Sequence, residues 1–108
     1  MTSITLSRAS GQLEGYYSAI FVPPLDGEGI KRLNHALQGE GANAVAYFPL
    51  IKEKEGDRFT WRQSIGSAEK EPDGLEVIIR GAGIGPNRLC SVLRAVLPTE
   101  ETVPRDYL

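Results

Sequence analysis

The chain has 108 residues, enough for one domain of ordinary size, and its single cysteine excludes an internal disulfide and a cysteine-based zinc site. A net charge of −2 gives no strong signal for nucleic acid, because general nucleic-acid binders usually carry a basic excess. No stretch approaches the roughly 18 apolar residues needed to cross a bilayer and no signal peptide is visible, so we expect a cytoplasmic protein that does not enter a membrane.

The first half of the chain predicts two strands, a helix and a third strand. Residues 3–9 alternate apolar and polar side chains, and residues 15–23 are rich in β-branched and aromatic residues. Residues 28–38 carry an apolar stripe with the spacing of a helix. Residues 44–51 contain few polar side chains, which indicates a strand buried on both faces, although Pro49 favours an edge or a bulge in its second half.

The second half predicts two more strands, a helix and a polar tail. A charged turn at 52–57 precedes a strand at 58–65, and a polar loop separates it from a strand at 75–80. A helix over 86–97 begins at a proline, which is favoured at the first helical position. The polar tail over 99–108 stands where a further strand is expected if the second half repeats the first.

The strand at 58–65 alternates cleanly between two faces. Phe59, Trp61 and Ile65 share one face, and Arg58 and Arg62 share the other with Thr60 and Ser64. An amphipathic strand usually turns its apolar face towards a core, so we predict that the aromatics are buried and the arginines face water. The residues predicted to be largely buried are Trp61, Phe59, Ile78, Leu89 and Leu93.

Two segments of the chain resemble each other. Residues 27–37 and 83–93 both read G-x-G-x-x-R-L-x-x-x-L, and both follow a β-rich run. The match predicts a β-β-α(-β) duplication with pseudo-repeats at about 1–54 and 55–108, its two helices related by an approximate two-fold axis. We therefore expect a single α+β domain over residues 1–108. It is a two-layer sandwich whose mixed, mostly antiparallel sheet of five or six strands carries both helices on one face. The segment from Tyr16 to Ile51 should cross over between parallel strands.

No constellation of catalytic or metal-binding residues is visible. The carboxylates are scattered over turns and the tail, without a pairing that suggests acid–base chemistry. His35 is the only histidine and is interpreted as a surface residue, since metal and acid–base sites need partners. Cys90 is interpreted as a small buried hydrophobe, with a thiolate near a helix start as the alternative. We predict no catalytic residue, no metal and no cofactor, and an enzyme is the less favoured interpretation.

Arginines are the first candidates for binding a partner. Arg58 and Arg62 lie on one strand face, close enough to engage one acidic patch. Arg32 and Arg88 fall in the first turns of the two helices if those helices begin at the glycines before them, where a cation opposes the helix dipole by about 0.3–1 kcal/mol. Either a nearby carboxylate such as Glu28 or Glu76, or a bound anion or acidic surface, should offset that cost. The candidate partner-binding set is Arg58, Arg62, Arg32 and Arg88.

The glycine-rich turn before the second helix is the alternative site. Backbone N–H groups at a helix start attract anions, and glycines let a phosphate come close. The turn matches neither a dinucleotide fingerprint nor a Walker A loop, and the competing interpretation is a tight connection that needs glycine dihedrals. The residues of this alternative ligand site are Gly83, Gly85, Asn87 and Arg88.

Two functions follow from these candidates. The first is a small non-enzymatic protein–protein interaction module, such as an adaptor, inhibitor or accessory protein, acting as a monomer or homodimer on a protein with an acidic patch. The second is a domain that binds a small ligand, anion or nucleotide at the glycine-rich turn. Binding should depend on the surface arginines in the first case, and a ligand should raise thermal stability in the second.

Overall fold

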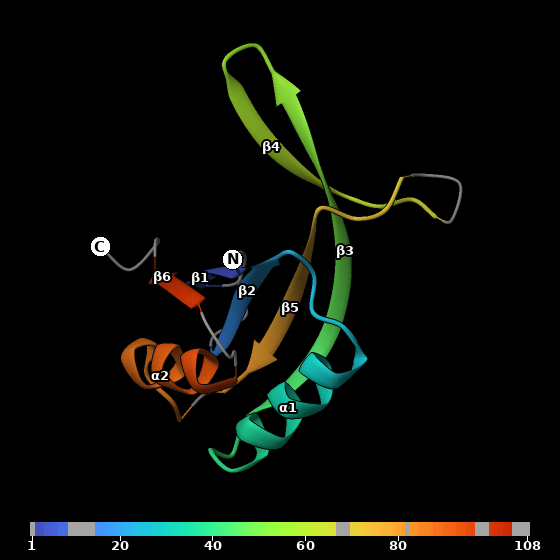
Figure 1. Cartoon of the computed structure of the whole chain (residues 1–108). Helices are drawn as coiled ribbons and strands as arrows, with labels where there is room; N and C mark the ends of the chain where they lie inside the picture. Colours follow the sequence, from blue (N-terminus) through green and yellow to red (C-terminus); the bar gives the residue numbers. More distant parts are fainter. Residues whose placement is uncertain (1, 9–14, 67–69, 82, 97–99, 105–108) are drawn as a thin grey trace.

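The computed structural model describes residues 2–8, 15–66, 70–81, 83–96 and 100–104. They form an α+β fold with one six-stranded sheet and two helices (Figure 1). The elements in chain order are β1 (Thr2–Arg8), β2 (Tyr16–Val22), α1 (Gly27–Gln38), β3 (Asn43–Glu55), β4 (Arg58–Gln63), β5 (Gly74–Arg80), α2 (Pro86–Val96) and β6 (Glu100–Pro104). The predicted fold class is confirmed, and part of the predicted polar tail is a sixth strand; residues 105–108 lie outside the described residues.

The strand order in the sheet is β4-β3-β5-β2-β1-β6. Neighbouring strands are antiparallel except β1 and β6, which are parallel. Because β2 and β3 are both antiparallel to β5, they run parallel to each other, as predicted. They are not neighbours, since β5 lies between them, so β2, α1 and β3 form a split β-α-β unit.

Both helices pack against the same face of the sheet. One cluster of buried side chains joins Leu33 and Leu37 of α1, Leu89 and Leu93 of α2, and inward residues of β1, β2 and β5. The strand members share a face, because the pairs Ile4–Phe21, Leu6–Ala19 and Ala19–Val77 lie opposite one another. The internal duplication remains a prediction. The outer strands are not equivalent in position, since β3 lies between β5 and β4 whereas its proposed counterpart β6 lies outside β1.

The N-cap of helix α1 lies three residues before Gly29, the glycine that would have to be the cap for Arg32 to fall in the first turn. The Gly29 N–H donates to the Asp26 carboxylate over 2.8 Å, and Asp26 has extended backbone dihedrals, so Asp26 is the N-cap. The placement of Arg32 in the first turn, which required the helix to begin at Gly29, is therefore wrong. Arg32 consequently lies in the second turn, where the unsatisfied N–H groups of the helix start no longer oppose a cation.

Strand β3 is longer and more exposed than the sequence predicts. It runs for 13 residues, and Val45 and Tyr47 are 46% and 37% exposed, so the prediction of burial on both faces is wrong. The physical reason is its position between β5 and the edge strand β4, at the side of the sheet farthest from α2. The predicted irregularity is present as a register shift between Ala44 and Ala46 rather than at Pro49.

The second half of β3 and all of β4 project from the body of the protein as a hairpin (Figure 1). There the predicted alternation of faces is correct but the predicted burial is wrong. Phe59 is 60% exposed and Trp61 is half-buried, and Ile65, predicted as part of the strand, lies beyond its end at Gln63 and is 85% exposed. Period-two alternation identifies the two faces of a strand, but it does not say whether another layer covers either face.

We predict that Leu93→Ala lowers the free energy of unfolding by about 2–5 kcal/mol, because Leu93 is fully buried between α2 and the sheet. The matched control is Ile65→Ala, a truncation of an exposed apolar side chain that should change stability by less than about 0.5 kcal/mol. Urea unfolding monitored by circular dichroism measures both. Equal losses in the two variants would show that the core is placed wrongly.

Candidate functional site

The projecting hairpin, residues 50–63 of β3 and β4, is the candidate site and is called the arm below. Its turn is Gly56-Asp57, where Gly56 has φ +62° and no described non-glycine residue has positive φ. Glycine with positive φ at the first position of a two-residue loop is the arrangement of a type II′ turn, which matches the twist of a hairpin. The turn therefore fixes the pairing of Glu55 with Arg58 and the register beyond it.

One face of the arm carries aromatic and lysine side chains. Lys52 lies opposite Trp61, and Lys54 lies opposite Phe59. The Lys52 ammonium lies 4.6 Å from the centre of the Phe59 ring and 5.9 Å from that of Trp61. An ammonium within about 6 Å of a ring face is attracted by its quadrupole. This aromatic face, Lys52, Lys54, Phe59 and Trp61, thus holds one ammonium over its two rings although Phe59 is exposed.

Trp61 anchors the arm to the body of the sheet. A Cβ placed on Gly74, the first residue of β5, would lie 3.2 Å from the Trp61 Cη2 atom and 3.3 Å from its Cζ3 atom. The indole therefore lies against the bare backbone of Gly74, across the intervening strand β3. Any larger residue at position 74 would push the ring away, so the glycine allows Trp61 to reach back from the arm.

The opposite face of the arm carries the two arginines of β4. Arg58 lies across from Glu55, and the Arg62 Nε–H donates to the Glu53 carboxylate over 2.8 Å. Arg62 also donates to the Gln63 carbonyl over 3.2 Å. Both Arg62 and Glu53 are partly exposed, and exposed ion pairs contribute about 0–1 kcal/mol. This arginine face, Glu53, Glu55, Arg58 and Arg62, confirms that the two arginines share one side of the strand.

Asp73 clamps the base of the arm. Its backbone N–H donates to the Leu50 carbonyl over 2.9 Å, and its carboxylate accepts from the Lys52 N–H over 2.8 Å. Lys70 is 3.2 Å from the same carboxylate. The hydrogen bond from the Lys52 backbone, with Lys70 nearby, lowers the pKa of Asp73. Asp73 precedes the first residue of β5, Gly74, which lies opposite Leu50. Its carboxylate therefore extends the contacts of β3 by two residues, from Leu50 to Lys52.

Arg88 is engaged elsewhere in the fold. Its guanidinium donates to both carboxylate oxygens of Glu40, with the Nε contact at 2.9 Å. The pair lowers the pKa of Glu40 and raises the pKa of Arg88. Arg88 lies in the first turn of α2, where a cation opposes the helix dipole. The ion pair with Glu40 supplies the carboxylate expected to offset that cost. The predicted partners, Glu28 and Glu76, are wrong, because the loop after α1 brings Glu40 there and Glu76 accepts from the Ser18 hydroxyl.

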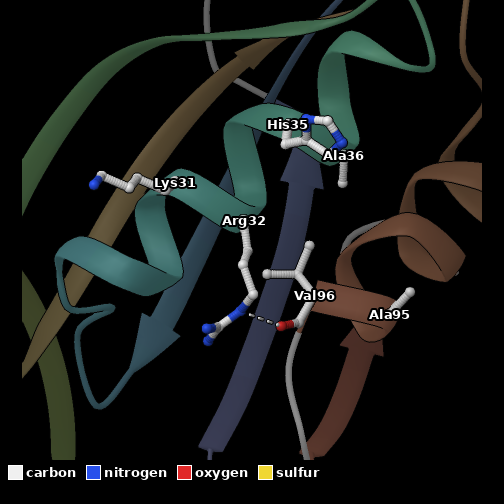
Figure 2. A pocket seen from close by; sticks show the side chains of 6 residues that line it. All are labelled: Lys31, Arg32, His35, Ala36, Ala95 and Val96. Atoms are coloured by element: carbon white, nitrogen blue, oxygen red, sulfur yellow. Dashed lines mark hydrogen bonds between the residues drawn. The ribbon is translucent and has the colours of Figure 1, made fainter.

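Arg32 lies at a shallow groove between the two helices (Figure 2). Its Nε–H donates to the Val96 carbonyl over 3.2 Å, at the end of α2. Figure 2 shows Arg32 and His35 on the side of α1 that faces α2, while Lys31 extends away from α2. The groove has a volume of about 300 Å³, and its lining residues are Lys31, Arg32, His35, Ala36, Ala95 and Val96. His35 is exposed, as predicted.

The glycine-rich turn before α2 depends on one glycine. A Cβ on Gly81 would lie 2.6 Å from the Ile84 side chain, so only glycine fits there. Gly83 and Gly85 have no neighbour within 4 Å of an added Cβ and no positive φ. The interpretation that they supply glycine dihedrals is therefore wrong. Both are exposed, as is Asn87, and their role in ligand binding stays a prediction.

The described residues hold no group of three potential metal ligands. Cys90 is buried, as predicted, and burial raises the pKa of its thiol. A raised pKa disfavours the thiolate that a cysteine nucleophile requires. The geometry of Cys90 is therefore that of a core residue.

Comparisons with protein-family models, with curated proteins and with solved structures each find no match to this chain. Within the described part of the chain, neither helix has the length and apolar character required to span a bilayer.

Three residues with these contacts, two at the arm and one beside Arg88, were not singled out from the sequence. Lys52, Asp73 and Glu40 were interpreted only as turn, loop or solubilising charges. The position of Lys52 opposite Trp61 could have been predicted from the Gly56-Asp57 dipeptide, because a two-residue turn sets which residues of a hairpin face each other. Asp73 and Glu40 act across long separations in the chain, where local pattern carries no signal.

We predict that Asp73→Ala loosens the base of the arm, whereas Asp73→Asn, which keeps an acceptor for the Lys52 N–H, does so less. Hydrogen exchange of the Lys52 amide is the readout, and protection should fall most in the alanine variant. Because the folded-state pKa is lowered, the contact stabilises the protein above the ordinary value of 3.8 and is lost as pH falls through the lower folded value. A carboxyl titration of Asp73 at or above 3.8, or unchanged exchange in Asp73→Ala, would contradict the clamp.

Proposed function

We propose that the protein is a non-enzymatic protein–protein interaction module, acting as an adaptor, inhibitor or accessory protein, and that the arm binds its partner. The observation that carries the proposal is Phe59, which is 60% exposed on a hairpin that projects from the body. Phe59 adjoins Trp61 on the same face of β4, and contiguous exposed apolar side chains are typical of binding surfaces.

The composition of the arm supports this proposal. Interfaces concentrate their binding energy in tryptophan, tyrosine and arginine, and the arm presents Trp61, Arg58 and Arg62 beside Phe59. The Lys52 ammonium and the backbone of Gly74 hold the two rings before any partner arrives. Side chains that are already ordered lose less conformational entropy on binding.

Charge indicates what kind of partner fits. Residues 50–63 carry four cationic side chains and three carboxylates, although the whole chain has a net charge of −2. The arginines lie on the edge strand, outside the glutamates of β3. An approaching partner therefore meets cations first, which favours an acidic protein surface through complementary potentials.

A photoreactive benzoylphenylalanine in place of Phe59 tests the proposal in a lysate of the native host. We expect one discrete adduct with a protein from the lysate, and we expect Arg58→Glu with Arg62→Glu to weaken it in a folded background. The control places the same photoreactive residue at Gln38, an exposed position at the end of α1. No adduct at position 59, or equal labelling at both positions, would sink the proposal.

The groove between α1 and α2 favours a second candidate function, binding of a small anion with an apolar part. Arg32 and His35 supply polar and cationic groups, and Ala36, Ala95 and Val96 supply the apolar wall. Phenyl phosphate combines these features, and it should raise the melting temperature with concentration. The rise should shrink in His35→Ala, and its absence, or an equal rise in that variant, rejects this candidate.

A further inference from the structure

We propose that the partner contributes an extended segment that adds as a new strand to the outer edge of β4, and that acidic and apolar residues alternate along this segment. The inference rests on the proposed function of the arm and names the class of partner. It follows from three features of β4: its free edge, the side chains on its two faces, and the sign of their charge.

Among the residues that the structure describes, strand β4 lies at the end of the sheet and pairs with β3 alone. The two-residue turn makes Glu55 and Arg58 a hydrogen-bonded pair, and such pairs recur at every second residue of an antiparallel ladder. The Ser64 N–H donates to the Pro49 carbonyl over 2.8 Å. The residues that bond to β3 are therefore every second one from Arg58 to Ser64. The backbone N–H and C=O groups of Phe59, Trp61 and Gln63 therefore point away from β3, toward an added strand.

The other edge of the sheet differs in sequence. Strand β6 contains Pro104, and proline, which cannot donate to a strand ladder, is a usual means of blocking an exposed edge. Strand β4 contains no proline, and its centre is Phe59-Thr60-Trp61, residues with high strand propensity. Of the two edges, β4 is the one suited to accept another strand.

The two faces of β4 define the sequence of the added segment. Successive side chains of a strand point to opposite faces, and directly opposite side chains interact. One set in the new strand would meet Arg58 and Arg62, and the alternate set would meet Phe59 and Trp61. Acidic residues suit the first set and apolar residues suit the second.

A second copy of this chain fits the edge poorly. Pairing two β4 strands antiparallel about a two-fold axis places the arginines of both copies on one face. Like charges on neighbouring strands are destabilising. An acidic segment removes that repulsion and gains attraction from the same side chains.

Single-stranded nucleic acid also fits poorly. Nucleic-acid binding needs exposed ring faces for base stacking, but the Lys52 ammonium lies over the Phe59 ring at 4.6 Å. The arginines that would meet phosphates lie on the opposite face of the strand, beside Glu53 and Glu55. These carboxylates repel a continuous phosphate backbone more than they repel a segment with spaced acidic residues.

The test uses a short capped peptide in which glutamate and valine alternate, titrated calorimetrically against the full chain. Arg58→Glu with Arg62→Glu should weaken binding about tenfold or more, and a lysine–valine peptide should then bind the variant better than the native protein. Gln38→Ala, an exposed position at the end of α1 and remote from the arm, should leave the affinity unchanged. Circular dichroism confirms that each variant is folded.

Backbone pairing is tested separately by N-methylation of the peptide. Only one alternate set of peptide N–H groups faces β4, so methylation of that set should abolish binding and methylation of the other should be tolerated. Binding that survives both methylations, or competition by an oligo-dT strand, overturns strand addition. If adducts at position 59 persist in that event, the arm remains the partner-binding site and only the mode proposed here is wrong. Concentration-dependent dimers that the peptide does not dissociate would also overturn the addition of a partner segment. They would show that the edge of β4 pairs with a second copy of this chain.

Discussion

The register of β3 is the constraint on which the rest of the structure depends. Its first half pairs with β5 and thereby belongs to the sheet under the helices, while its second half pairs with β4 and forms the arm. The strand changes partner around Leu50, which lies opposite both Gly74 of β5 and Gln63 of β4. A slip of one residue would exchange the two faces of the strand. It would carry Lys52 away from the aromatic rings and from Asp73, and it would move Tyr47 away from Asn34 of α1, to which its hydroxyl donates.

Two contacts transmit that register from the body to the arm. Trp61 lies on the backbone of Gly74, and Asp73 accepts from the Lys52 N–H, so both contacts are at the point where β5 begins. A two-stranded hairpin alone is at best marginally stable in water. The arm is ordered because its base is held by side chains that reach past the last shared strand pair. The exposed rings and arginines beyond that base are therefore presented in a defined geometry, which a binding surface needs.

The sequence was sufficient for the order and type of the first seven elements but not for their environment, and it ended β3 four residues too early. Alternation along 58–65 correctly separated Phe59 and Trp61 from Arg58 and Arg62, because side-chain direction in a strand is a local property. The burial of the aromatics was predicted wrongly, since it depends on where the helices end over the sheet. The helices were placed within a few residues by their apolar stripes, and Leu89 and Leu93 are buried as expected. The Arg88–Glu40 pair and the Asp73 clamp join residues distant in the chain, and no local pattern specifies such contacts.

Strand addition at β4 would bind the partner through the backbone of one strand as well as through its side chains, which a merely charged surface would not do. Hydrogen exchange of individual β4 amides, with and without the glutamate–valine peptide, tests this claim most directly. The amides of Phe59, Trp61 and Gln63 should exchange quickly in the free protein and gain protection with the peptide, while those of Thr60 and Arg62, already paired with β3, should change little. Equal changes at both sets, or none at the first set under saturating peptide, would contradict strand addition at β4.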